Sequence, residues 1–353
     1  MKKVFVGMSG GVDSSVAAAL LKEARLPDGS QGFSVTGVFL KPWQPEGVRC
    51  LWEKDRADAL RVASHLGIPF ETWDVAEEYG KRVGRVMLDA YARGETPNPD
   101  VLCNREIKFG IFYDQALARG ADAVATGHYA RIEPHGDTFT VHTGDDRAKD
   151  QSYFLRTLRE EQLPHILFPV GAMEKTLVRT EAERFGLITH DKKDSQGVCF
   201  IGAFDMHDFL KRHITTAPGP IMNERGERMG THDGVQLYTI GQRHGLSLGG
   251  QEKPLYVVAK DIERNMLVVG EQQSLHVSAI RVSDIHWIGA APSLPLSCDV
   301  RIRYRAPVTP CTLSEDGVCT FSHQQRGVAV GQSAVFYDGD RMLGGGVIAD
   351  VTR

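Results

Sequence analysis

Residues 7–15 read Gly-Met-Ser-Gly-Gly-Val-Asp-Ser-Ser and lie near the start of the 353-residue chain. The run Lys2 to Met8 is apolar at its centre and predicts a strand, whereas the residues from Ser14 onward have the composition of a helix. A strand, a glycine loop and a helix together present backbone N–H groups and a helix N-terminus to a phosphate. Gly10 and Gly11 allow the backbone to approach the anion closely. The stretch therefore predicts a phosphate-binding loop.

Two common phosphate-binding motifs are absent from the sequence: neither G-x-x-x-x-G-K-[ST] nor G-x-G-x-x-G occurs. The pattern Ser-Gly-Gly-x-Asp-Ser resembles instead the PP-loop of enzymes that cleave ATP between its α and β phosphates. Such enzymes adenylate a substrate and release pyrophosphate. An ordinary tight turn between a strand and a helix is the alternative, but the serines and the aspartate at these spacings favour the phosphate site.

Length and composition predict a soluble protein of two or three domains. The chain is 42% apolar and 24% charged, as globular proteins are. It shows neither a signal peptide pattern nor an apolar run long enough to span a membrane, so we expect a cytoplasmic protein with no membrane partner. The net charge of −4 argues against a generally basic surface but permits a local RNA-binding patch. Six cysteines without a C-x-x-C pair predict reduced thiols and no structural zinc site.

Residues 1–200 alternate strand-like and helix-like segments, which predicts an α/β domain with a parallel sheet covered on both faces. The predicted strands include 35–40, 68–73 and 123–126, and the predicted helices include 55–66, 77–93 and 106–119. Ligands of such sheets lie at the carboxyl ends of the strands. The 7–15 loop and Gly127 both follow strands, so we expect them to face one crevice.

From about residue 200 the pattern changes to short strands separated by Gly and Pro. Residues 201–275 predict a small central β-rich domain with strands at 236–240, 255–259 and 266–269. Residues 276–353 alternate with a period of two and predict a small C-terminal β-barrel. Within it, three arginines at 301, 303 and 305 would share one face of a strand. A charge run of this kind alone predicts a solvated face.

Two of the six cysteines lie in polar, turn-rich segments. Cys103 follows the stiff segment Asn-Pro-Asp at 98–100 and is expected to open a helix. A thiol at a helix N-terminus near basic residues should have more thiolate character, and Asp100 could move a proton. Cys199 lies in the segment Asp-Ser-Gln-Gly-Val-Cys-Phe at 194–200. The other four cysteines are interpreted as inert, with those at 298, 311 and 319 buried in β-type surroundings.

Six sequence blocks now point to one family. In chain order they are residues 9–15, 98–105, 126–130, 149–155, 194–200 and 238–243. Together they resemble the bacterial MnmA-type tRNA 2-thiouridylases, and the resemblance covers nearly the whole chain. It implies a PP-loop domain followed by the small central domain and a tRNA-contacting barrel.

The resemblance implies ATP-dependent 2-thiolation of the wobble uridine, position 34, in tRNAs for Lys, Glu and Gln. ATP would adenylate O2 of the base, and sulfur held as a persulfide on Cys199 would then displace AMP. Cys103 would be the second thiol, attacking the persulfide or closing a disulfide with Cys199, and Asp100 the acid/base. An amide-like oxygen leaves poorly, so it must be activated before a thiol replaces it. The implied cofactors are ATP and Mg²⁺, and the implied sulfur donor is a cysteine desulfurase or a sulfur-relay protein.

The same resemblance implies a set of binding residues. Those for ATP are Gly7, Met8, Ser9, Gly10, Gly11, Val12, Asp13, Ser14, Ser15, Leu40 and Gly127. Those for the target base are Asn98, Pro99 and Asp100, in a rim stiff enough to receive an unstacked base. Those for tRNA are His128, Lys149, Asp150, Gln151, Arg303, Tyr304 and Gln332. Because a carboxylate would repel phosphate, we expect Asp13 to contact Mg²⁺; capping of the following helix is the alternative.

Two other functions are compatible with the glycine loop. One is an amide-forming ligase of the PP-loop class, resembling argininosuccinate or NAD synthetase, which would need no cysteine pair. The other is a sulfur-carrying or RNA-binding module without turnover. Cys103 and Cys199 favour the thiolation enzyme over the first, and Asp13 with both cysteines favours it over the second.

Overall fold

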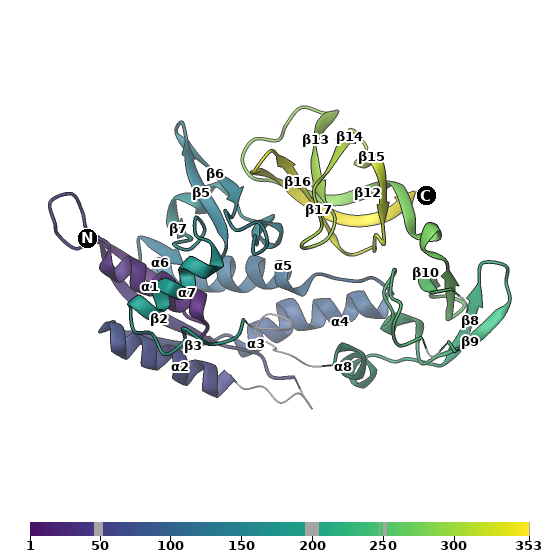
Figure 1. Cartoon of the computed structure of the whole chain (residues 1–353), viewed down its shortest axis with the longest axis horizontal. Coiled ribbons are helices and arrows are strands. Elements are labelled where there is room, and N and C mark those ends of the chain that lie inside the picture. The colour runs from purple at the N-terminus through teal and green to yellow at the C-terminus, as the bar shows by residue number, and fades with distance from the viewer. Residues whose placement is uncertain (46–51, 195–204, 247, 250–252, 353) are drawn as a thin grey trace.

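The structure is a computed structural model that describes residues 1–45, 52–194, 205–246, 248–249 and 253–352. Figure 1 shows its three parts: a helix-covered sheet at the left, a barrel at the upper right and a smaller sheet at the lower right. In these described ranges, no helix combines the length and the apolar character needed to cross a membrane.

The N-terminal part is built on a five-stranded sheet with the order β3-β2-β1-β4-β7. The strands are β1 (Lys2–Gly7), β2 (Phe33–Lys41), β3 (Phe70–Asp74), β4 (Ala123–Ala125) and β7 (Ile166–Leu167). Neighbouring strands are parallel throughout, which confirms the predicted α/β fold. Because β1 is central, the glycine loop that follows it lies in the middle of the carboxyl edge of the sheet.

Helices cover both faces of this sheet. On one face lie α1 (Val12–Glu23), α2 (Trp52–Leu66) and α7 (Lys175–Arg184). On the other lie two long irregular helices: α3 (Ala76–Tyr79) with η1 (Gly80–Gly84) and α4 (Arg85–Ala92), and α5 (Pro99–Cys103) with η2 (Asn104–Phe112) and α6 (Tyr113–Ala118). Successive side chains of a strand point to opposite faces of the sheet, so β1 contributes to two hydrophobic cores. Val4 and Val6 pack on the first face and Phe5 on the second.

The α5–α6 helix begins earlier than the predicted range 106–119. It starts at Pro99, and the Oδ1 atom of Asn98 accepts a hydrogen bond from the Val101 N–H (3.3 Å), which caps the helix. Proline suits the first helical position because its missing N–H has no partner there. Cys103 therefore lies one turn inside the helix, and the prediction that it opens a helix is wrong. The stretch η2 that follows is π-helical, and π-helical turns are frequently found at functional sites.

The central part contains α8 (Met206–His213) and a sheet with the order β10-β11-β8-β9. Its strands are β8 (Gly219–Asn223), β9 (Arg228–His232), β10 (Tyr256–Asp261) and β11 (Met266–Gly270). The predicted strands at 255–259 and 266–269 are thus confirmed. The predicted strand at 236–240 is wrong, because η5 (Val235–Leu237) is a 3₁₀ turn. Leu237 and Tyr238 are adjacent and both buried, whereas a strand would send them to opposite faces.

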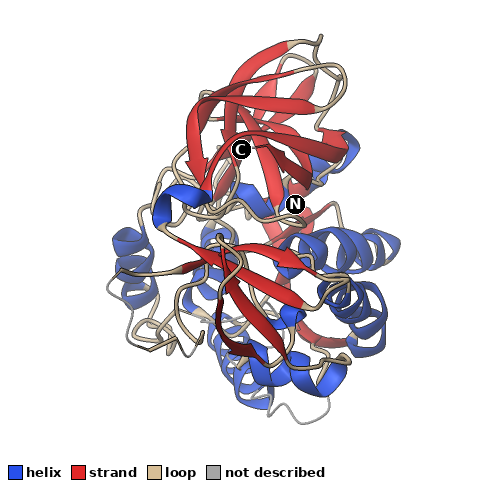
Figure 2. Cartoon of the chain, turned by 90° about the vertical axis from the view of Figure 1, so that its right-hand side faces the viewer, coloured by secondary structure: helices blue, strands red, loops and turns tan. Residues whose placement is uncertain are grey.

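The C-terminal part is the predicted barrel. Its strands are β12 (His276–Trp287), β13 (Leu296–Arg301), β14 (Thr309–Leu313), β15 (Val318–Arg326), β16 (Ser333–Asp338) and β17 (Arg341–Thr352). Pairing of β12 with β17 closes it, and a hairpin from the N-terminal part, β5 (Ala130–His135) and β6 (Thr138–Thr143), extends its sheet beside β17. Figure 2 shows the barrel strands above the helix-covered part. Three short 3₁₀ helices lie between strands of these parts: η3 (Ser152–Leu155), η4 (Glu160–His165) and η6 (Gln272–Leu275).

The strand expected to carry three arginines on one face ends too early for that arrangement. β13 stops at Arg301, and Arg305 has a φ of +63°, in the left-handed region. Arg301 turns inward to an ion pair with Asp150, whereas Arg303 is exposed. The prediction of a shared cationic face is therefore wrong.

Candidate active site

The glycine loop leaves the start of α1 open. Gly11 is the N-cap of α1, and no side chain caps the helix. The loop hydroxyls bond within the loop: Ser9 Oγ lies 3.2 Å from Ser14 Oγ, and Ser15 Oγ donates to the Gly11 carbonyl oxygen (2.8 Å). Gly10 has a φ of +76°, and a Cβ atom there would lie 2.2 Å from the carbonyl oxygen of Asp55. The loop is therefore held in shape while a helix N-terminus, which favours anions, has no side-chain acceptor.

Gly127, just beyond the end of β4, packs directly against this helix start. A Cβ atom on Gly127 would lie 2.6 Å from the Ser14 nitrogen and 2.7 Å from the Asp13 carbonyl carbon. Leu40 is near the end of β2 and is buried, as are Met8 and Val12. The predicted meeting of the 7–15 loop and Gly127 at one edge of the sheet is thus seen in the structure. That these residues bind ATP stays a prediction.

Asp13 is not a capping residue, which makes the capping alternative wrong. It is the second residue of α1, and its Oδ1 atom accepts hydrogen bonds from the Tyr129 hydroxyl (2.7 Å) and from Lys175 Nζ (2.6 Å). Burial and the charge of Asp13 raise the pKa of Tyr129, so its hydroxyl stays protonated and donates. The Asp13 carboxylate is therefore neutralised by a cation beside the loop.

Further charges gather around the same loop. Lys175 Nζ also lies 2.8 Å from Asp194, which pairs in addition with Lys149 (2.5 Å) and Arg179 (3.1 Å). Burial alone would raise the pKa of Asp194, but the hydrogen bonds from Lys149 and Lys175 outweigh it and lower the pKa to about 2. Lys192 Nζ donates to the Gly10 carbonyl oxygen (2.9 Å) and pairs with two carboxylates of α2. Lys175 and Lys192 thus contact the predicted phosphate loop directly, and Lys149 and Arg179 are linked to Lys175 through Asp194.

Sequence reasoning missed Lys175 and Tyr129. Both are positioned by tertiary structure, because α7 packs on α1 and Tyr129 follows β4. One sequence signal was available for Lys175: it is the first residue of a helix, where a cation opposes the helix dipole unless an anion lies nearby.

Cys103, the last residue of α5, is fully buried in an apolar core. The expectation that it lies outside apolar surroundings is therefore wrong. Asp100 is half-buried in the first turn of the same helix. The neighbouring Asn104 is buried, and its Oδ1 atom has no hydrogen-bond partner in the described part of the chain. Cys199, the other predicted catalytic thiol, lies outside the described residues.

His128 lies in the interior, at 6% exposure, between the rings of Phe109 and Phe168. Its Nδ1 atom lies 2.7 Å from Thr126 Oγ1, and its Nε2 atom lies 3.3 Å from Lys108 Nζ. Burial, helped by the nearby charge of Lys108, holds the pKa of His128 well below its ordinary value, so the ring is neutral. These contacts favour a packing role, and contact with tRNA stays a prediction.

Asp150 connects the N-terminal part to the barrel. It is 2% exposed, accepts hydrogen bonds from the Gly144 and Ser152 N–H groups, and pairs with Arg301 of β13 (2.6 Å). Gln151 beside it accepts a hydrogen bond from the Tyr129 N–H through Oε1 (3.0 Å). The structure therefore gives both residues a structural role, and their contact with tRNA stays a prediction.

Gln332 of the barrel holds the segment that leads into α5. Its Nε2 atom donates to the carbonyl oxygens of Thr96 (2.8 Å) and Pro97 (3.1 Å). The Thr96 N–H donates in turn to the Val330 carbonyl oxygen (2.8 Å). The barrel thus fixes the residues immediately before Asn98, the first of the three predicted base contacts.

Two further predicted tRNA residues lie beyond the end of β13. The Tyr304 ring packs on Phe154 with a centroid distance of 4.4 Å. Arg303 is exposed and donates to the Gly327 carbonyl oxygen (2.7 Å). Arg303 is accessible to a partner, and its assignment to tRNA stays a prediction.

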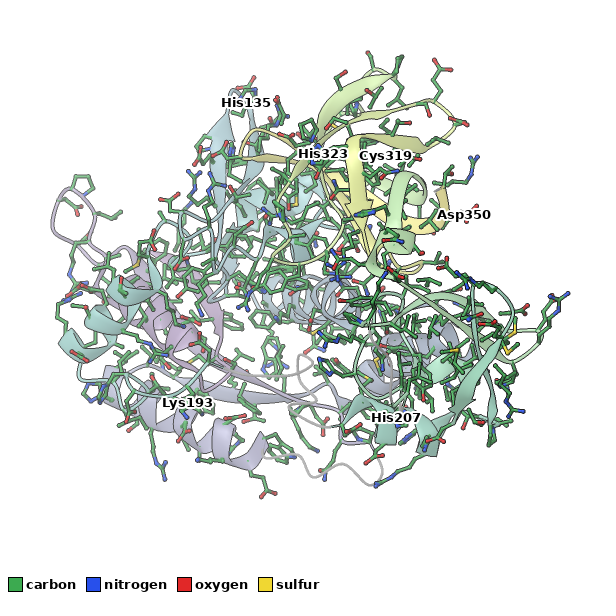
Figure 3. All side chains as sticks on the ribbon, turned by 45° about the vertical axis from the view of Figure 1, so that its right-hand side comes forward. His135, Lys193, His207, Cys319, His323 and Asp350 are labelled. Atoms are coloured by element: carbon green, nitrogen blue, oxygen red, sulfur yellow. The ribbon has the colours of Figure 1, made fainter. Side chains whose placement is uncertain are left out.

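The barrel cysteines lie apart from this site. Cys298 and Cys311 face each other across β13 and β14, with their sulfur atoms 3.7 Å apart, beside a cavity of about 520 Å³. Mutual contact with Cys311 and burial raise the pKa of the Cys298 thiol. Cys319 is buried on β15, and Figure 3 shows it in the barrel. The pKa of the Cys311 thiol is raised as well, so Cys298 and Cys311 are protonated thiols, in keeping with their interpretation as inert.

An uncapped glycine loop at the centre of a parallel sheet, followed by a small β domain and a barrel, defines a protein of the PP-loop class. Three family models match it: the tRNA methyl transferase HUP domain over residues 2–203, the tRNA methyl transferase PRC-barrel domain over 207–271 and the aminomethyltransferase beta-barrel domain over 277–348. Relatives named tRNA-specific 2-thiouridylase MnmA also match over 99% of the chain at more than 40% identity, so the chain belongs to the MnmA family of tRNA-specific 2-thiouridylases.

Curated relatives match over almost their full length. The tRNA-specific 2-thiouridylase MnmA of Listeria monocytogenes serotype 4a is 45% identical over 99% of this chain and 95% of its own length. That of Geobacillus thermodenitrificans is 43% identical with the same coverage. Among solved structures, the U34-tRNA thiolase NcsA from Methanococcus maripaludis is 19% identical over 56% of this chain and 61% of its own, with a TM-score of 0.37. A score this low carries no structural argument.

Proposed function

We propose that this chain 2-thiolates the wobble uridine of tRNA, using ATP to activate the base and a cysteine persulfide to supply the sulfur. The observation that carries the proposal is the match over 99% of the chain to proteins named tRNA-specific 2-thiouridylase. The amide-forming ligase is not supported by these relatives. We place the reaction in the cytoplasm, where tRNA and reduced thiols are available.

The open start of α1 supports the first half of the reaction. Its backbone N–H groups would hold the phosphates of ATP at the centre of the sheet edge. Asp13 is the second residue of α1, directly after the loop, so its carboxylate could bind Mg²⁺ together with phosphate oxygens. The ion, when bound, would neutralise charge on the phosphates.

The segment from Asn98 to Cys103 supports the second half. The target base would enter beside Asn98 and Pro99, which a cap and a proline keep rigid. Asp100 would accept the N3 proton as O2 attacks the α phosphate. Sulfur from the Cys199 persulfide would then attack C2 and displace AMP, with Cys103 resolving the persulfide. Because Cys103 is fully buried, α5 must shift to expose its thiol during this step.

The proposed partners follow from this chemistry. They are tRNAs of the Lys, Glu and Gln type and a persulfide donor, either a cysteine desulfurase or a sulfur-relay protein. The testing experiment is nucleoside mass analysis of tRNA incubated with the protein, ATP, Mg²⁺ and a persulfide donor. We expect 2-thiouridine to form only when ATP is present. Absence of 2-thiouridine with a competent donor, or its formation without ATP, would refute the proposal.

A further inference from the structure

One lysine, Lys175, pairs with two carboxylates beside the glycine loop. Lys175 is the first residue of α7, and its side chain is 12% exposed. Its Nζ atom lies between Asp13 (2.6 Å) and Asp194 (2.8 Å). It is thus a nearly buried ammonium group whose charge is directed at the loop that should hold pyrophosphate.

The position of this lysine is unfavourable for α7 itself. A cation at a helix N-terminus opposes the helix dipole. The N-cap residue Glu174 makes no side-chain hydrogen bond to the helix, and the Lys175 N–H donates to Asp146 Oδ2 instead (3.0 Å). The carboxylates that pair with the Lys175 ammonium group lie outside α7, on Asp13 of α1 and on Asp194. The lysine is therefore placed with respect to the loop and does not stabilise its own helix.

The two carboxylates that pair with Lys175 differ in the other groups that they contact. Asp194 keeps two other cations, Lys149 and Arg179, if Lys175 moves away. Asp13 keeps the Tyr129 hydroxyl and, in our proposal, gains Mg²⁺ when ATP binds. A small movement of the Lys175 ammonium group toward the phosphates would leave neither carboxylate without a partner.

We propose that Lys175 is a catalytic residue that binds the leaving pyrophosphate during adenylation. This inference rests on the proposed function. Uridine O2 forms a bond to the α phosphorus, the bond from that phosphorus to the oxygen bridging to the β phosphate breaks, and its electron pair leaves on pyrophosphate. The N3 proton of the base goes to Asp100. Lys175 stays protonated throughout and donates hydrogen bonds to the β and γ phosphate oxygens, where negative charge develops.

The test compares Lys175→Met and Lys175→Arg with a matched control, Arg184→Met. Arg184 lies on the same helix and pairs with Glu23 of α1, so its replacement also removes one charge and one link between these two helices. The measured quantities are tRNA-dependent pyrophosphate release, the affinities for AMP and for inorganic pyrophosphate, and thermal unfolding. AMP lacks the β and γ phosphates and therefore serves as an internal control for the nucleotide pocket.

For Lys175→Met we expect kcat for pyrophosphate release to fall about 100-fold, the magnitude that loss of one charge-stabilising donor produces. Pyrophosphate should bind about tenfold more weakly, as expected when one charge-assisted hydrogen bond is lost. AMP affinity should not change, and Lys175→Arg should recover part of the rate. Arg184→Met should behave as wild type in all four measurements.

Two results would overturn the inference. One is wild-type pyrophosphate affinity and release by Lys175→Met. The other is an equal loss of AMP and pyrophosphate affinity together with a lowered melting temperature, which would show that Lys175 only supports the fold. Failure of the proposed function looks different, because the wild-type protein itself would then release no pyrophosphate when given tRNA and ATP.

Discussion

Replacement of Gly127 by alanine tests whether the start of α1 is the phosphate site. The added Cβ atom would lie 2.6 Å from the Ser14 nitrogen, against about 3.4 Å for an ordinary contact, a shortfall of 3.4 − 2.6 = 0.8 Å. The atoms that it meets include backbone of α1, so a side-chain rotation cannot relieve the clash. The first turn of α1 must therefore move by somewhat less than 1 Å.

Such a displacement should slow the reaction while the protein stays folded. Overpacking of one methyl group costs about 1–3 kcal/mol, whereas a misplacement of about 1 Å at a reacting centre costs on the order of 100-fold in rate. We expect Gly127→Ala to remain folded by circular dichroism and to lose about that factor in tRNA-dependent pyrophosphate release. Gly32→Ala is the control, since a Cβ atom there would lie no closer than 3.4 Å to another residue. A folded Gly127→Ala variant with wild-type KM for ATP and wild-type kcat would refute the assignment of the loop.

Three further predictions concern the remaining site residues. Asp13→Asn keeps the shape of the side chain but not its charge, so the variant should melt near the wild-type temperature and fail to release pyrophosphate. Normal pyrophosphate release would contradict a Mg²⁺ contact at Asp13. Cys103→Ser and Cys199→Ser should each abolish 2-thiouridine in tRNA while ATP still binds, and Cys298→Ser should not; a fully active Cys199→Ser variant would contradict the persulfide assignment. Because burial lowers the pKa of His128, unfolding lets its imidazole take up a proton, so its contribution to stability is present at neutral pH and is lost as the pH falls below about 6.5. Melting temperatures between pH 7.5 and 5 should therefore fall less steeply for His128→Gln than for wild type, and equal slopes would contradict the buried neutral histidine.

Local sequence signals were sufficient for the sheet and the glycine loop. Val4, Phe5 and Val6 form a continuous apolar run because β1 is buried on both faces, and Gly10 marks the left-handed turn after it. The environment of Cys103 could not be predicted in the same way. The polar residues before it, Asn98 and Asp100, lie at the start of α5. The cysteine itself lies one turn later, on the buried side of the helix.

Long-range ion pairs were equally out of reach of sequence reasoning. Arg301 and Arg303 are two residues apart and would share a face if β13 continued, but the strand ends at Arg301. Arg301 then reaches a carboxylate 151 positions away in sequence, that of Asp150. The same holds for Lys175 and Asp13, which are 162 positions apart. Periodicity describes one element at a time, and these pairs depend on how different elements pack.

The barrel supports the segment proposed to bind the base, in addition to its proposed role as a surface for tRNA. Gln332 donates to the carbonyl oxygens of Thr96 and Pro97, so the barrel fixes the residues immediately before Asn98. Removal of residues 276–353 would also leave the buried carboxylate of Asp150 without Arg301, and loss of one partner of a buried pair is strongly destabilising. A deletion would therefore also disturb Asn98 and the residues after it. A loss of tRNA affinity in the deletion variant would then not be assigned to the barrel surface alone. Point changes at exposed Arg303 separate the two effects, because its side chain bonds only within the barrel among the described residues and can be removed while the Gln332 contacts stay in place.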